Sequence, residues 1–165
     1  IRDRVERIGD LYKYTYTVTS PETNKGIIND LFIDVSCDLD FGEVHIPVEG
    51  DRLGHSENSS KDGKHVPVEV FAAYGTSNIY GVSNDNKVYW NIYRKPGDAV
   101  TNIYMISPAP PGKRAFKLIP YMDVDEKWDY GSYEDNDPSL PWIGDFTVTG
   151  LVIGPACKID APALP

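Results

Sequence analysis

The sequence predicts an all-β fold, an antiparallel β-sandwich of about eight strands, from three observations. Apolar residues recur at every second position over several segments, which is the period of a half-buried strand. The 14 glycines and 13 prolines fall between these segments, where they favour turns. No stretch has a sustained helical period with caps. The uneven loop lengths favour a sandwich with Greek-key connections over a barrel.

The clearest strand runs from Leu11 to Thr19. Its larger side chains fall on one face and its polar side chains on the other: Tyr12, Tyr14, Tyr16 and Val18 against Lys13, Thr15 and Thr17. The remaining candidates, taken in chain order, cover residues 27–37, 44–48, 66–74, 87–94, 100–107, 114–122 and 143–153. A polar stretch at 50–64 reads as a long exposed loop between two of them.

The 165 residues suffice for one domain of ordinary size. We expect an N-terminal arm at residues 1–9, a single sandwich domain at 10–160 and a proline-rich tail at 161–165. The arm precedes the first clear alternation and is expected to add a strand to a neighbouring sheet edge.

The net charge of −9 excludes a phosphate-backbone binder, because such a protein needs a basic face. The same charge disfavours an anionic membrane surface as a partner. The chain has no run of 18 apolar residues, so we expect no membrane span.

Cys37 and Cys157 are the two cysteines, 120 positions apart. They are either two buried thiols or one long-range disulfide, and a secreted domain favours the disulfide. Asn58 begins an Asn-Ser-Ser acceptor sequence for N-glycosylation in the polar stretch. These features place the protein outside the cell or on its surface.

An acidic stretch near the C-terminus has two interpretations. Calcium takes six to eight oxygen ligands, which a dense set of carboxylates supplies: Asp123, Asp125, Asp129, Asp135 and Asp137. The alternative is a solvated acidic loop on an acidic protein. No cofactor is required, and calcium is the candidate. A glycosidase carboxylate pair fits poorly, because loop carboxylates in water do not have separated pKa values.

Aromatic residues lie among these carboxylates. Flat rings beside polar groups suit a sugar-binding platform, for which the candidates are Trp128, Tyr130 and Tyr133. The alternative is that the rings cover the end of the core. We expect Trp90 and Trp142 in the core.

No set of residues points to catalysis. His45, His55 and His65 lack the short spacing of a zinc site. Cys157 would need a free thiol to act as a nucleophile. No nucleophile elbow, phosphate loop or dinucleotide motif is present, and we expect a protein that is not an enzyme.

Two regions carry a resemblance: the strand Tyr12–Pro21, and Lys95–Asp98 together with the later Ser107–Gly112 loop. They resemble secreted bacterial immunoglobulin-like domains. The resemblance covers about half of the chain. It implies an immunoglobulin-like sandwich in an extracellular setting, and it implies no catalytic residues.

Two functions are therefore expected. The first is a non-catalytic extracellular structural or adhesive module, which assembles with copies of itself or binds other surface polymers. The alternative is a calcium-dependent carbohydrate-binding module with glycans as partners.

Overall fold

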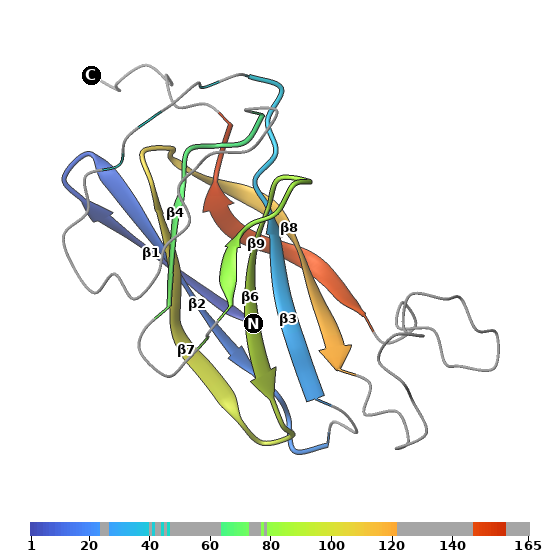
Figure 1. Ribbon diagram of the computed structural model, residues 1–165. Coiled ribbons are helices and arrows are strands. Elements are labelled where there is room, and N and C mark those ends of the chain that lie inside the picture. Colours follow the sequence, from blue (N-terminus) through green and yellow to red (C-terminus); the bar gives the residue numbers. More distant parts are fainter. Residues whose placement is uncertain are drawn as a thin grey trace.

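The computed structural model is a sandwich of two antiparallel sheets (Figure 1). It describes residues 1–23, 27–39, 41, 44, 46, 64–72, 77, 79–121 and 147–157, and in that part of the chain it contains strands and no helix. The four-stranded sheet has the order β1 (Arg2–Ile8), β2 (Leu11–Thr19), β7 (Ala99–Ser107) and β4 (Glu69–Ala72). The five-stranded sheet has the order β5 (Tyr80–Val82), β6 (Lys87–Arg94), β3 (Ile27–Asp34), β8 (Pro111–Tyr121) and β9 (Val148–Pro155). The predicted all-β sandwich is confirmed.

The core lies between the two sheets. The buried face predicted for β2 is confirmed, because Tyr14, Tyr16 and Val18 on that face are completely buried. Trp90 on β6 is also completely buried, and its ring centroid lies 5.8 Å from that of Tyr16 across the sandwich. These tyrosines therefore contribute to folding through apolar burial, and they are not available for contacts with a partner.

The expectation of a free N-terminal arm is wrong. Residues Arg2–Ile8 form β1, which pairs with β2 from Arg2 opposite Thr17 to Ile8 opposite Leu11. The two strands are joined by Gly9 and Asp10, with Gly9 at φ +60°. A two-residue turn of this kind holds the strands in register, and glycine accepts the positive φ without steric cost. The strand was missed because five of its seven residues are charged.

Two further differences concern short segments. The three-residue strand β5 was not predicted, because three residues cannot establish a period. A strand was expected at residues 44–48, but Val44 and Ile46 lie outside any strand, and the other three lie outside the described residues.

The segment that leads into β4 is bonded to the residues that follow β3. The Val66 amide donates to Val35 O at 2.9 Å and the Cys37 amide to Lys64 O at 3.0 Å, so this segment pairs with the continuation of β3. The chain then enters β4 in the other sheet. A segment that pairs in one sheet and continues into the other fixes the relative position of the two layers at this end.

Candidate functional site

The predicted disulfide is confirmed. Cys37 follows β3 and Cys157 follows β9, and a disulfide joins them with their Cα atoms 5.5 Å apart. Both cysteines of the chain are thus used, so Cys157 is not a free nucleophile. Disulfides persist in oxidising compartments, and the bond is in keeping with a location outside the cytoplasm.

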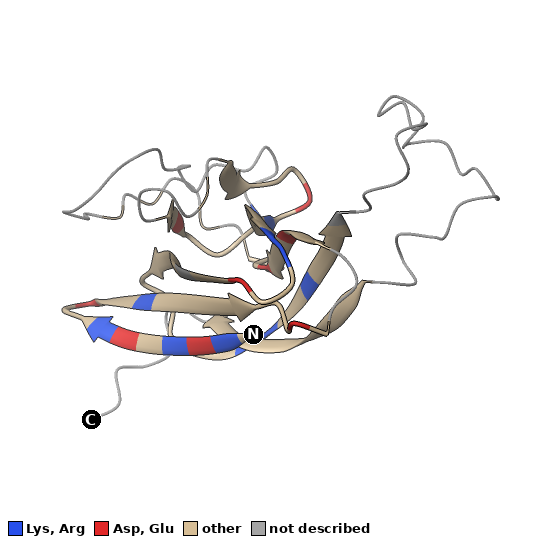
Figure 2. Cartoon of the chain, turned by 90° about the horizontal axis from the view of Figure 1, so that it is seen from below, with Lys and Arg blue, Asp and Glu red and all other residues tan. Residues whose placement is uncertain are grey.

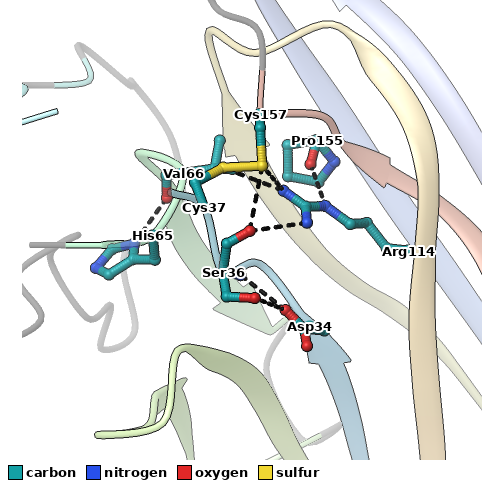
Figure 3. The surroundings of a disulfide bond; sticks show 8 residues. All are labelled: Asp34, Ser36, Cys37, His65, Val66, Arg114, Pro155 and Cys157. Carbon is teal, nitrogen blue, oxygen red and sulfur yellow. Dashed lines mark hydrogen bonds between the residues drawn. A yellow bond between two sulfur atoms is a disulfide. The ribbon is translucent and has the colours of Figure 1, made fainter. Parts of the chain in front are cut away.

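Arg114 of β8 lies against this disulfide (Figure 3). Its Nε donates to Pro155 O at 2.6 Å, its Nη1 to Ser36 O at 3.0 Å, and its Nη2 lies 3.3 Å from Cys157 Sγ. Burial lowers the pKa of Arg114, while the nearby carboxylate of Asp34 acts in the opposite direction. A guanidinium stays charged under these conditions, so Arg114 acts as a cross-link between the ends of β3 and β9.

Within the described residues, His65 and Glu69 are the two buried side chains whose chemistry could suggest a metal. His65 is 2% exposed, with Nδ1 2.7 Å from Val66 O, and its Nε2 has no hydrogen-bond partner. Glu69 is 6% exposed, and its Oε2 likewise has none. The described residues contain no group of three or more histidine, cysteine or acidic side chains that could hold a metal ion.

Most residues singled out from the sequence lie outside the described part of the chain. They comprise the calcium candidates Asp123, Asp125, Asp129, Asp135 and Asp137, the sugar-platform candidates Trp128, Tyr130 and Tyr133, the acceptor Asn58, the expected core residue Trp142, and His45 and His55. The tail at 161–165 also lies outside it. Each of these assignments stays a prediction.

The sandwich has two long sides, where an edge strand of one sheet meets an edge strand of the other. On the first side β4 faces β5. All four residues of β4 are buried, and Trp90 Nε1 donates to Phe71 O at 2.9 Å. Phe71 also packs with Ile46 and Ile106 on the outer surface of its sheet. This edge is covered by side chains.

On the second side β1 lies next to β9. The Ile153 amide donates to Asp3 Oδ2 at 2.8 Å, and the Tyr16 hydroxyl donates to Ile153 O at 2.7 Å. Burial raises the pKa of Tyr16 well above its ordinary value, so the hydroxyl stays a donor. Both outward-facing main-chain groups of Ile153 are therefore bonded to side chains of the four-stranded sheet.

Among the described strands, β1 has an edge that no other strand covers, which we call the open edge. The two-residue turn makes Ile8 and Leu11 the closing hydrogen-bonded pair, so every second residue of β1 from Ile8 backwards bonds β2. The amides and carbonyls of the intervening Asp3, Val5 and Arg7 point away from β2. Because β1 is the last strand of its sheet, no described strand pairs with these groups.

Charged side chains line this open edge. Figure 2 shows β1, beside the N-terminal label, as a strand of alternating basic and acidic residues. Val5 and Glu6 are half-buried and the other five residues are exposed. Exposed charges are a common protection against uncontrolled strand pairing. Sequence reasoning missed this edge; the signal that would have found it is the Gly9-Asp10 turn between two extended segments.

Comparisons with known proteins give no relatives: no family model, no curated protein and no solved structure matches this chain. Within the described residues there is no helix long and apolar enough to cross a membrane.

Proposed function

We propose that this protein is a non-catalytic extracellular structural or adhesive module with an immunoglobulin-like sandwich, which works by contacts with copies of itself or with other surface polymers. The observation that carries the proposal is the open edge of β1. A sheet edge with unpaired main-chain groups is a template for an added strand, and main-chain hydrogen bonds supply most of the affinity in such complexes.

The surroundings of the edge support the same function. The disulfide and Arg114 hold the ends of β3 and β9 together, and Asp3 and Tyr16 hold β9 against the four-stranded sheet. A rigid scaffold lowers the entropic cost of binding, because little of the backbone has to be ordered on contact. The disulfide also suits an oxidising location outside the cell.

The test is a measurement of assembly and of glycan binding side by side. Light scattering over a range of protein concentrations, with calcium and with a chelator, is expected to show a mass that increases with concentration. A glycan array with the same samples covers the alternative, a calcium-dependent carbohydrate-binding module. A protein that stays monomeric and binds no surface polymer contradicts the proposal, and a monomer that binds glycans only with calcium favours the alternative.

A further inference from the structure

We infer that β1 pairs antiparallel with β1 of a second copy, about a two-fold axis that passes through Val5. This inference rests on the proposed function and names its partner and its register. A two-fold axis places the same surface of both copies in contact, so a strand related to itself by the axis must be antiparallel. The four-stranded sheets of the two copies would then join into one continuous sheet.

The main chain of β1 is suited to this pairing. Asp3, Val5 and Arg7 are the residues whose amides and carbonyls point to the open edge. With the axis at Val5, Val5 lies opposite Val5, and Asp3 lies opposite Arg7 of the second copy. In an antiparallel ladder such pairs exchange both hydrogen bonds, which gives about six main-chain hydrogen bonds across the interface.

The charges of β1 are complementary in the same register. Arg4 lies opposite Glu6 of the second copy, and by symmetry Glu6 lies opposite Arg4. Asp3 and Arg7 form a second set of opposite charges on the other face of the strand, where Asp3 Oδ2 already accepts the Ile153 amide and Oδ1 is the oxygen left for Arg7. Opposite charges at directly paired positions stabilise a sheet, and like charges destabilise it. The apolar Val5, which already packs against the core, is the residue at the axis.

The neighbouring registers are disfavoured. The backbone pattern allows the strand to shift only in steps that keep outward-pointing residues opposite each other. One such step towards the N-terminus places Arg2 opposite Glu6 but also Arg4 opposite Arg4 of the second copy. One step towards the C-terminus places Glu6 opposite Glu6. The register centred on Val5 is the one of these three that has opposite-charge pairs and no like-charge pair, and charged pairs of this kind contribute mainly to specificity.

The present contacts of Arg4, Glu6 and Arg7 leave these three side chains available. Arg4 Nε lies 3.3 Å from Glu6 Oε1 within the strand, and the two side chains are 74% and 39% exposed. An exposed ion pair of this kind contributes little, so exchange for the same pair between copies costs little. Arg7 Nε donates to Gly9 O at 3.1 Å, and the guanidinium has further donors for a carboxylate.

The experiment is a charge exchange, read by sedimentation of the full chain over a range of concentrations. The unchanged protein is expected to dimerise. Glu6→Arg gives a strand with arginine at both positions of the pair, and Arg4→Glu gives one with glutamate at both. Each variant alone is expected to dimerise about tenfold more weakly or worse, because both symmetric pairs become repulsive. An equimolar mixture of the two variants is expected to recover the dimer.

Two controls separate the register from other effects. Asp85→Arg makes the same change in net charge as Glu6→Arg, in the turn before β6 on the opposite side of the sandwich, and is expected to leave the dimer unchanged. Val5→Pro removes an outward-pointing amide, which an edge strand tolerates, and is expected to give a folded monomer whose melting temperature falls by no more than the loss of a half-buried side chain explains.

Two outcomes would overturn the inference. They differ in whether the proposed self-assembly is lost as well. If the unchanged protein assembles and Glu6→Arg, Arg4→Glu and Val5→Pro all assemble equally well, another surface makes the contact and the proposed function stands. If the unchanged protein is monomeric at millimolar concentration, the pairing of β1 is wrong and self-assembly is lost with it.

Discussion

The two long sides of the sandwich manage exposed strand edges in opposite ways. On the β4–β5 side, burial protects the edge: all four residues of β4 are buried, and Trp90 Nε1 donates to the outward-facing carbonyl of Phe71. On the β1–β9 side, Asp3 and Tyr16 occupy the edge of β9 at Ile153, while β1 remains open and charged. One side of the sandwich is therefore closed by buried side chains, and the other ends in a charged edge strand, on which the proposed pairing depends.

Removal of the disulfide at the end of β9 should have the largest effect on the stability of the protein. We expect the double change Cys37→Ala and Cys157→Ala to lower the free energy of unfolding by about 5 kcal/mol, because the closed loop spans 120 positions. Hydrogen exchange should accelerate in β9 before it accelerates in β4. Chemical denaturation and exchange of the oxidised protein and the variant measure both effects. Equal acceleration in β4 and β9 would contradict the assignment of the disulfide to one side.

Replacement of Trp90 should have the second largest effect on the free energy of unfolding. Trp90→Phe removes the donor to Phe71 O and leaves a space beside Tyr16, and we expect a loss of about 3 kcal/mol in the free energy of unfolding. The exchange of β4 amides should be affected most. A loss below about 1 kcal/mol would show that the buried edge does not depend on this hydrogen bond.

The hydroxyl of Tyr16 gives the matched test on the other side. Tyr16→Phe retains the ring and removes only the donor to Ile153 O, so we expect a loss of about 1 kcal/mol. Since burial raises the pKa of Tyr16, the difference between the proteins should not change from pH 6 to pH 9. Thermal melts of both proteins across that range check this. A difference that disappears at pH 9 would mean that the hydroxyl ionises normally.

Replacement of Asp30 on β3, away from both long sides, should have the smallest effect on the free energy of unfolding. Burial raises the pKa of Asp30, with the opposite effect of the Asn29 amide being smaller. A raised pKa in the folded state means that stability decreases as the pH rises through the folded pKa. Asp30→Asn should therefore increase the free energy of unfolding at pH 7, by about 0.5 kcal/mol, and should change it less at pH 3. An equal change at both pH values would contradict this cause.

Much of the fold could be predicted from the sequence. The alternation through Tyr14 and Tyr16 identified a strand with one buried face, and two distant cysteines in a secreted-looking domain identified the disulfide. These predictions succeeded because a half-buried strand imposes a period of two on its residues. Strand β1 has two apolar residues, Val5 and Ile8, which are three positions apart, so its sequence shows no period of two.

The candidate site was harder to predict. The open edge depends on which strand is last in its sheet and on which backbone groups point outwards, and both follow from the pairing of β1 with β2. The bond from Ile153 to Asp3 joins residues 150 positions apart. No local pattern in the sequence encodes such a contact. The charges of β1 were visible from the start, but their complementarity under a two-fold axis requires the strand and its register.

The most direct test of the open edge is hydrogen exchange of the β1 amides at low and high protein concentration. The account predicts that the amides of Asp3, Val5 and Arg7 become protected as the concentration rises, because they then donate to a second copy. The buried amides of β4 should not change. Exchange at Asp3, Val5 and Arg7 that is equally fast at every concentration, in a sample whose mass shows assembly, would contradict the central claim.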